Sequence, residues 1–357
     1  MKPITGARSS APQNGGEDVV KRQRAKLEEK GSYFVEAKPN YSFVSSGCTL
    51  LDCAMGGGYP LGRIVNVVGD KSSCKTALAT EALINFMVTY PDGIPAYRDT
   101  EAAFDQGYAE AMGLSLDRID FGNKKEPLQT VEQFARDFDA FLEQRIKTDT
   151  PGIYVVDSLD ALSDDAEMER DIGKDTFGTA KAKLLSMFFR KTAHRIEQSR
   201  VLLLVISQVR DNIGAMFGEK HKRSGGRALD FYSSIALWLA HIETLRREIS
   251  KVKRPYGVHI RAKCKKNKIS LPFREADFEF IFGYGVEDLK ASVEWLKEVG
   301  RLKDASINPT QVKDYLKGIE EMDAAEYAKE QKMTAEVVRQ VWREIETSFL
   351  PKRAKYG

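Results

Sequence analysis

Runs of consecutive apolar residues alternate along this chain with segments in which apolar residues recur every three or four positions. The runs are typical of strands covered on both faces, and the recurring pattern is typical of amphipathic helices. The predicted strands are 64–68, 94–100, 118–122, 152–158 and 201–207, and the predicted helices are 75–90, 131–147 and 180–198. This alternation predicts an α/β fold with a central, mostly parallel sheet wound by helices on both faces.

Beyond this alternating region the pattern changes. Further strand-like runs that would extend the sheet are 235–242, 258–264 and 278–282. Helical patterns at 291–299, 309–315 and 334–349 follow them. They predict a small, mostly helical C-terminal domain, 286–357, after a core at 41–285.

The first 40 residues form a separate predicted region. Residues 1–18 have the composition of a disordered tail. Residues 19–30 show a charged helical pattern with too few apolar positions to be stable alone. This N-terminal helical arm is therefore either solvated or docked on a neighbouring molecule.

Composition narrows the class of protein. The chain has 357 residues, of which 42% are hydrophobic, so it can bury a sizeable core. No apolar run is long enough to cross a membrane, and the polar N-terminus lacks the core of a signal peptide, which predicts a cytoplasmic protein. The four cysteines lack the spacing of a disulfide framework or a zinc site. The net charge of +3 does not require a nucleic-acid partner, so a basic surface must come from local clustering.

The stretch 69–76, GDKSSCKT, lies between a predicted strand and a predicted helix and is typical of a phosphate-binding loop. Such a loop aims backbone N–H groups and a helix N-terminus at a triphosphate. Lys75 would reach the β- and γ-phosphates and Thr76 would ligate Mg²⁺, although a coincidental strand–turn–helix is the competing interpretation. The predicted nucleotide-binding residues of this loop are Gly69, Asp70, Lys71, Ser72, Ser73, Cys74, Lys75 and Thr76.

Three polar residues at the ends of predicted strands are candidates for the chemistry. Asp157 ends an apolar strand, as does the carboxylate that joins the Mg²⁺ shell in nucleotide hydrolases. Glu101 ends the strand that we expect beside the phosphate loop, and is the candidate to activate the attacking water. Its alternative is a solvated loop glutamate. Gln208 follows 201–207, where its amide would lie beside the γ-phosphate.

Two other features allow two interpretations each. Cys74 stands where the usual loop has glycine, and a positive φ there would cost about 1–2 kcal/mol. Its thiol, next to Lys75 at a helix N-terminus, is either a packing group or a thiol of lowered pKa that makes activity sensitive to oxidation. The basic cluster KCKKNK, 263–268, is either a solvated turn or an anion-binding group.

Two polar, glycine-containing loops, 159–178 and 209–227, carry isolated large apolar residues. Such loops are expected to order on a partner, because they cannot bury their own apolar groups. The predicted helix between them places Lys183, Ser186 and Arg190 on one face. This stripe suits a phosphate backbone, although an ordinary solvated helix face is the alternative.

Taken together, these elements resemble the RecA-family DNA strand-exchange recombinases over 41–285. The matching stretches are VSSGCTLLDCAMGGGYPLGRIVNVVGDKSSCKTAL, DTEAAFDQGY, IYVVDSLDAL, ISQVRDNIGAMFGEKHKRSGGRALDFY and KKNKISLPF. The loops between the nucleotide motifs match as well as the motifs do. The resemblance implies a RecA-like P-loop ATPase core that binds ATP and Mg²⁺ between adjacent protomers of a helical filament on single-stranded DNA. It also implies pairing of that strand with homologous double-stranded DNA.

The resemblance implies roles for individual residues. The catalytic residues would be Glu101, Lys75, Gln208, Lys266 and Lys268, the last two reaching the ATP of a neighbouring protomer. The metal residues would be Thr76 and Asp157, and the adenine-side residues Asp105, Tyr108, Phe282 and Gly283. The DNA-binding residues would be Phe177, Lys183, Ser186, Arg190, Arg210, Asn212, Ile213, Ser224, Gly225, Gly226 and Arg227. Phe217 and Phe231 would join Lys266 and Lys268 at the protomer interface.

Three departures from the family pattern bear on function. Cys74 replaces the loop glycine, which suits a phage-encoded relative, and Asp230 replaces a basic interface residue. The chain ends basic where many relatives end acidic, which predicts readier DNA binding. The leading hypothesis is an ATP-dependent recombinase. A hexameric helicase on the same core and a DNA-coating filament protein with weak hydrolysis are the alternatives.

Overall fold

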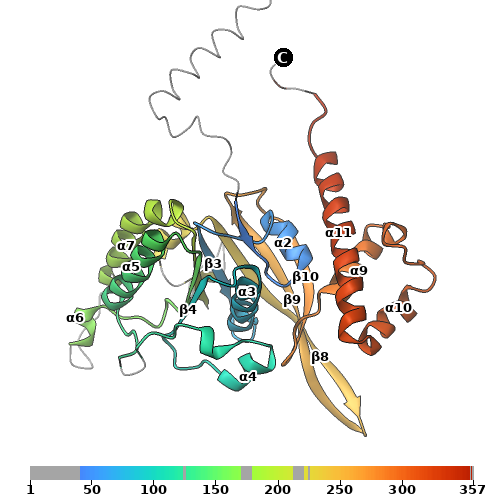
Figure 1. Ribbon diagram of the computed structural model, residues 1–357, viewed down its shortest axis with the longest axis horizontal. Helices are drawn as coiled ribbons and strands as arrows, with labels where there is room; N and C mark the ends of the chain where they lie inside the picture. The colour runs from blue at the N-terminus through green and yellow to red at the C-terminus, as the bar shows by residue number, and fades with distance from the viewer. Residues whose placement is uncertain are drawn as a thin grey trace, which may run out of the picture. The chain divides into compact units, whose positions relative to one another are not determined.

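In the computed structural model, a nine-stranded sheet organises the chain (Figure 1). The structure describes residues 41–123, 126–169, 179–211, 221–223, 226–353 and 355. The strand order is β11-β10-β9-β8-β3-β6-β5-β4, with β7 paired to β6. The strands are β3 (Ile64–Gly69), β4 (Ile94–Asp99), β5 (Gly152–Asp157), β6 (Val201–Asp211), β7 (His221–Arg223), β8 (Ile235–Ile249), β9 (Val252–Asn267), β10 (Glu275–Ile281) and β11 (Gly285–Val286). A separate two-stranded sheet pairs β1 (Phe43–Val44) with β2 (Tyr59–Pro60).

The centre of the large sheet is parallel. Strands β8, β3, β6, β5 and β4 pair in parallel, whereas β9, β10 and β11 are added in antiparallel fashion. Every residue of β3 and β5 is buried, as expected for strands covered on both faces. Successive side chains enter opposite cores, so Val155 packs in one hydrophobic cluster and Val156 in the other. The predicted α/β fold with a mostly parallel sheet is confirmed.

Helices cover both faces of this sheet (Figure 1). The first core packs under α2 (Thr49–Met55), α3 (Lys75–Thr89), α4 (Gln106–Ala111), α9 (Asp288–Glu298) and α11 (Ala324–Ser348). The second core packs under α5 (Val131–Thr148), α7 (Thr179–Glu197) and α8 (Gly226–Tyr232). Shorter helical segments are α6 (Asp165–Met168), α10 (Val312–Gly318) and the 3-10 turns Leu116–Arg118, Leu302–Ala305 and Ile319–Glu321.

Local capping explains where two of the long helices begin. The Thr130 hydroxyl accepts from the Gln133 N–H at the start of α5, and the Gln133 side chain bonds back to the Thr130 backbone. Asp323 accepts from the N–H groups of Ala325 and Glu326 at the start of α11. We predicted α5 almost to the residue. The prediction for α11 began at residue 334, ten residues late, because its first turns carry few apolar side chains.

Two predictions about the sheet are wrong. Residues 118–122 form no strand: Asp120 makes a single bridge to Ala96, because a 3-10 turn occupies Leu116–Arg118. The strand before Glu101, β4, does not lie next to the phosphate-loop strand β3. Strands β6 and β5 come between them, which places β4 at the edge of the sheet.

The hairpin of β8 and β9 is much longer than predicted. We expected strands only at 235–242 and 258–264, where the residues are apolar. The observed strands continue to a two-residue turn at Ser250 and Lys251, whose φ angles are 52° and 64°. Such a turn matches the twist of a hairpin. The outer half is mostly exposed and polar, so the apolar pattern could not predict it, and Figure 1 shows it projecting from the sheet.

The predictions for the two ends of the chain differ in outcome. The helical character of 286–357 agrees with α9, α10 and α11, although α11 also packs against the core helix α2. The boundary at 285 stays a prediction. The tail and arm at 1–40 lie outside the described residues. Among the described helices, none is both long and apolar enough to cross a membrane.

Candidate functional site: the phosphate loop and its surroundings

The phosphate loop connects β3 to α3 at the edge where the parallel strands end. Gly69 closes β3, and a Cβ at this position would collide with the Ser73 hydroxyl. The Asp70 carbonyl accepts from Ser73 Oγ at 2.7 Å and from Lys75 Nζ at 2.7 Å. Burial lowers the pKa of Lys75, while Asp157, Glu101 and Asp70 act to raise it. The loop is thus folded around its lysine, which is held among acidic groups.

Two residues of the loop have left-handed backbone. Cys74 has φ 60°, so the condition under which we expected a cost at this position is met, and Ser72, for which we had no expectation, has φ 59°. Each conformation costs about 1–2 kcal/mol for a residue with a side chain. The prediction of a lowered pKa at Cys74 is wrong. Burial raises the pKa of this thiol to about 11, and the opposing effect of Lys75 is smaller.

Thr76 and Asp157 are brought together as a metal site requires. Thr76 Oγ1 donates to Asp157 Oδ2 at 2.6 Å, and the Tyr97 hydroxyl donates to the same oxygen at 2.8 Å. Burial raises the pKa of Asp157, and the bonds from Thr76 and Tyr97 oppose that effect. Oxygen ligands of this kind suit Mg²⁺, which takes one or two protein ligands beside phosphates and water. Among the described residues, no group of three or more His, Cys, Asp or Glu side chains could hold a metal ion by itself.

Glu101 and Gln208 meet across the end of the sheet. Gln208 pairs with Gly69 in the register of β6 and β3, which places it beside the phosphate loop. Its Nε2 donates to Glu101 Oε1 at 2.7 Å, and the Ser158 hydroxyl donates to the same oxygen. Glu101 follows the edge strand β4, and the preceding Thr100 is bonded to the end of β5, where its N–H donates to the Asp157 carbonyl at 2.8 Å and its hydroxyl to the Ser158 carbonyl at 2.6 Å. Sequence reasoning missed Ser158, whose only signal was its place directly after Asp157.

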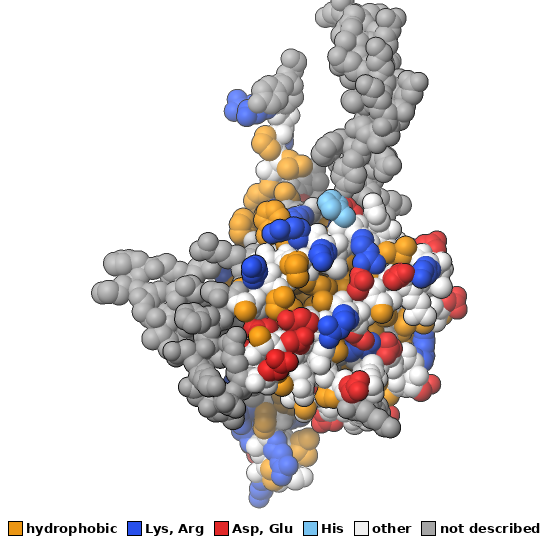
Figure 2. Space-filling model, turned by 90° about the vertical axis from the view of Figure 1, so that its left-hand side faces the viewer, with side chains coloured by type: hydrophobic (Ala, Val, Ile, Leu, Met, Phe, Trp, Pro, Cys, Tyr) orange, Lys and Arg blue, Asp and Glu red, His pale blue; other side chains and the backbone are white. Residues whose placement is uncertain are grey.

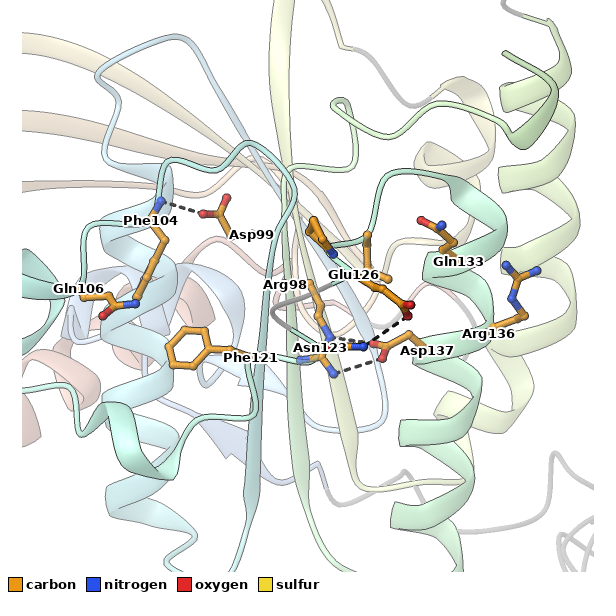
Figure 3. Close-up of a pocket in the computed structure, with 12 residues that line it drawn as sticks. Arg98, Asp99, Phe104, Gln106, Phe121, Asn123, Glu126, Gln133, Arg136 and Asp137 are labelled. Atoms are coloured by element: carbon orange, nitrogen blue, oxygen red, sulfur yellow. Dashed lines mark hydrogen bonds and ion pairs between the residues drawn. The ribbon is translucent and has the colours of Figure 1, made fainter. Parts of the chain in front are cut away.

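Asp99 shapes the turn after β4 (Figure 3). Its carboxylate accepts from the backbone N–H of Glu101 at 3.1 Å and from that of Phe104 at 2.9 Å. Phe104 lines a cavity next to phosphate-loop residues 72–76 and also a second cavity, of 580 Å³, which nothing in the sequence pattern predicted. In that second cavity the buried Arg98 is paired with Asp137 at 2.8 Å.

A cavity of 390 Å³ opens beside the loop on the side predicted for the adenine. Asp105 caps α4 by accepting from the Tyr108 N–H at 2.9 Å, and both residues line the cavity. Phe282 lines it as well, and Gly283 follows with φ 74°. Burial raises the pKa of Tyr108, and a bond with the Gly283 backbone opposes this. The four predicted adenine-side residues therefore lie together. The loop residues in the cavity wall are Ser72, Ser73, Cys74, Lys75 and Thr76.

Lys266 and Lys268, called the paired lysines below, lie outside the cavity wall. Lys266 Nζ donates to the carbonyls of Asp230 and Phe231, and Lys268 Nζ donates to that of Phe231 at 3.0 Å. These carbonyls end α8, so the paired lysines serve as a C-terminal cap in this protomer. Phe231 is 70% exposed beside them.

The predicted DNA-binding residues are only partly described. Lys183 and Arg190 are exposed on α7, with Ser186 half-buried between them. The backbone of Arg210 belongs to β6, and that of Gly226 and Arg227 to α8. The predictions outside the described residues are Phe177, Asn212, Ile213, Phe217, Ser224 and Gly225. On the face in Figure 2, basic and acidic side chains are interspersed, so charge does not single out a DNA-binding surface on this face.

Comparison with known proteins identifies the family. The family model of the RecA N-terminal domain matches residues 29–287. The chain belongs to the RecA family. It is 33% identical to Protein RecA of Arthrospira platensis over 75% of this chain and 69% of that relative. It is 35% identical to Protein RecA of Nostoc punctiforme over 72% of this chain and 67% of that relative. It is 32% identical to Protein RecA of Prochlorococcus marinus over 84% of this chain and 78% of that relative.

Membership of the RecA family confirms the predicted family and settles the general function. This is a protein of ATP-dependent homologous recombination and strand exchange. RecA-family proteins are DNA-dependent ATPases that use ATP with Mg²⁺. The match includes the phosphate loop, the strand ends and the cavity described above.

Proposed function

We propose that this protein hydrolyses ATP in response to single-stranded DNA while forming a helical filament that pairs with homologous double-stranded DNA. The observation that carries the proposal is the hydrogen bond between Glu101 and Gln208, beside Lys75, Thr76 and Asp157. A water-activating carboxylate, a sensor amide, a phosphate-binding lysine and a metal-binding pair thus meet at the end of one sheet. This is the set of groups that phosphoryl transfer to water needs.

In this mechanism the residues act chiefly by position and charge. Lys75 and the N–H groups at the start of α3 hold the phosphates. Thr76 and Asp157 would hold Mg²⁺, which supplies charge neutralisation at the phosphates. Glu101 orients the attacking water and accepts its proton. Ser158 keeps the Glu101 carboxylate in position.

Gln208 can couple the nucleotide to DNA. Its side chain contacts Glu101, while its backbone N–H donates to Asp160 Oδ2 at 2.6 Å. The same strand, β6, continues to Asp211 and leads directly into residues 212–220, which carry predicted DNA contacts. A γ-phosphate that draws the amide away from Glu101 would therefore pull on the strand that enters the second DNA loop.

The complete site would include a second protomer. In the proposed filament the paired lysines leave the α8 carbonyls and bind the ATP of the neighbour, because a triphosphate is a stronger acceptor than a carbonyl. Phe217 and Phe231 would pack at that interface. The exposure of Phe231 supports this assignment.

On DNA, we assign the phosphates to Lys183, Ser186 and Arg190 and to the second loop. The second-loop residues are Arg210, Asn212, Ser224, Gly225, Gly226 and Arg227. Phe177 and Ile213 would separate base triplets by stacking or wedging. A protein that carries out strand exchange on DNA would act in the cytoplasm of a bacterium or phage-infected cell. The segments 1–40, 41–285 and 286–357 would act as docking arm, ATPase core and accessory domain.

Release of phosphate with and without single-stranded DNA tests the proposal. The wild type should hydrolyse ATP faster with DNA, and Glu101→Gln should lower the rate by about 10²–10⁴-fold while nucleotide binding remains. Glu110→Gln, an exposed glutamate on α4, is the control. A rate unchanged by DNA and by Glu101→Gln would instead favour a coating protein. Unwinding of a forked duplex by closed rings would favour a helicase.

A further inference from the structure

A groove of 770 Å³ lies away from the nucleotide site, where α11 meets the core. Its walls come from α11, from the end of α3, from the region around β1 and α2, and from the turn between β9 and β10. It shares no lining residue with the nucleotide cavity. Phe43, Leu271 and Trp342 provide apolar wall. Neither the ATP chemistry nor the predicted DNA contacts use this groove.

The charges in the groove are unbalanced. The carboxylate of Glu346 is held by Arg274 through Nε at 2.8 Å and Nη2 at 2.5 Å. The buried carboxylate of Asp52 accepts hydrogen bonds from the Ser45 hydroxyl at 2.6 Å, from the Ser46 hydroxyl at 2.6 Å and from the Ser46 N–H at 2.8 Å. Both acidic groups are therefore satisfied internally. The bond between Arg274 and Glu346 also fixes α11 to the turn, so the groove is preformed.

Two exposed arginines in the wall have no such partner. Arg339 and Arg343 lie one turn apart on α11. Arg343 Nε donates to the Arg339 carbonyl at 3.1 Å within the helix, and in the described part of the chain neither guanidinium forms an ion pair. The groove therefore presents two positive charges at the i and i+4 positions of a helix.

Exposed apolar side chains occur in the chain segments that form the groove. Leu271 lines the groove itself, and Val88, Phe273, Phe349 and Leu350 lie close to its lining residues in the sequence. Phe273 is 65% and Phe349 is 75% exposed. Large apolar side chains gathered at a polar surface mark interaction sites.

We propose that this groove docks an acidic, amphipathic peptide segment of another protein. The apolar face of such a segment, folded as a short helix, packs on Leu271 and Trp342. Two carboxylates one turn apart on the peptide pair with Arg339 and Arg343, in the manner of helices that bind in grooves. Duplex DNA fits the groove less well, because a phosphate backbone gains nothing from the apolar rim.

Fluorescence anisotropy with the full-length protein tests this proposal. The probe is a short fluorescein-labelled peptide whose helix would carry Leu and Phe on one face and Glu at i and i+4 on the other. One control peptide has Lys in place of Glu, and another has Ser in place of Leu and Phe. The first peptide should bind, and both controls should bind at least about tenfold more weakly.

Protein variants locate the site. Arg339→Glu combined with Arg343→Glu should weaken binding of the probe at least about tenfold. Lys313→Glu combined with Lys317→Glu is the matched control, since these exposed cations have the same spacing on α10. It should leave binding unchanged. Leu271→Ser, an exposed position, tests the apolar contact should the arginine variant fail to fold, and it should also weaken binding.

Three outcomes would overturn the proposal. One is equal affinity of the wild type and the arginine variant, with both folded by circular dichroism. Another is undiminished binding of the Ser-substituted peptide, which would make the groove a simple anion site. The last is displacement of the probe by a short DNA duplex together with loss of duplex binding in the arginine variant, which would make it a nucleic-acid surface.

Discussion

The strand-end groups and the paired lysines are two parts of the predicted ATP site, and they are held in different ways. The strand-end groups form two bonded pairs within one chain, Thr76 with Asp157 and Gln208 with Glu101. The paired lysines instead cap the end of α8 and do not line the nucleotide cavity. One part is therefore assembled by folding alone, while the donors of the other are occupied by backbone carbonyls of the same chain.

Loss of the phosphate-loop lysine should have the largest effect. Lys75→Ala removes the cation held among Asp70, Glu101 and Asp157, and should lower ATP hydrolysis about 10²–10³-fold. Lys303→Ala, an exposed lysine of the 3-10 turn Leu302–Ala305, is the control and should change the rate little. Phosphate release and binding of a fluorescent ATP analogue measure the two effects. Equal losses in both variants would mean that Lys75 has no special role.

Removal of the paired lysines should impair DNA-stimulated hydrolysis without impairing nucleotide binding. Lys266→Ala combined with Lys268→Ala should lower DNA-stimulated hydrolysis about 10²-fold, because charge stabilisation from the neighbouring protomer is lost. Binding of the ATP analogue to the dilute protein without DNA should be unchanged.

A mixing experiment tests whether the lysines act between protomers. Lys75→Ala protein keeps intact paired lysines, and the double-lysine variant keeps an intact phosphate loop. Equal amounts of the two, assembled on single-stranded DNA, should recover part of the hydrolysis that each lacks alone. No recovery above the sum of the separate rates would place both parts of the site in the same protomer.

A smaller effect is expected from the strained loop. Cys74→Gly relieves a φ of 60° and should stabilise the protein by about 1 kcal/mol in urea unfolding. Since burial raises the pKa of Cys74 to about 11, its thiol should react slowly with iodoacetamide at neutral pH. An unchanged midpoint in Cys74→Gly would show that the loop absorbs the strain, and rapid alkylation of the native thiol would contradict the buried state.

The last predicted effect concerns the pH dependence of stability. The Glu81 carboxyl of α3 lies against Gly47 and Gly285, and burial raises its pKa from 4.5 to about 7, with Asp288 adding to the shift. The folded protein thus holds a proton that the unfolded chain releases, so this residue makes stability fall as pH rises from about 4.5 to about 7. In Glu81→Gln that fall should be reduced, as measured by thermal unfolding across the range. Glu336→Gln, exposed on α11, should keep the wild-type dependence.

Much of the nucleotide end of the sheet was predictable from sequence, because its residues follow apolar runs. The buried part of a strand ends where its apolar run ends, which indicated the positions of Asp157 and the phosphate loop. The place of Glu101 was predicted correctly for a wrong reason. Sequence order suggested that β4 neighbours β3, whereas the sheet order puts two strands between them. Ser158 and the outer half of the β8–β9 hairpin were missed, since neither shows in an apolar pattern.

The sequence by itself determined the α/β fold, the phosphate loop and the strand-end carboxylates, because burial on both faces of a sheet demands local apolar runs that can be read in order. Only the tertiary structure decided that Gln208 reaches Glu101, that the paired lysines cap α8, and that Arg339 and Arg343 face a groove. These contacts join residues far apart in the chain. Strand order and helix packing decide which of these residues meet, and neither can be read from a local sequence pattern.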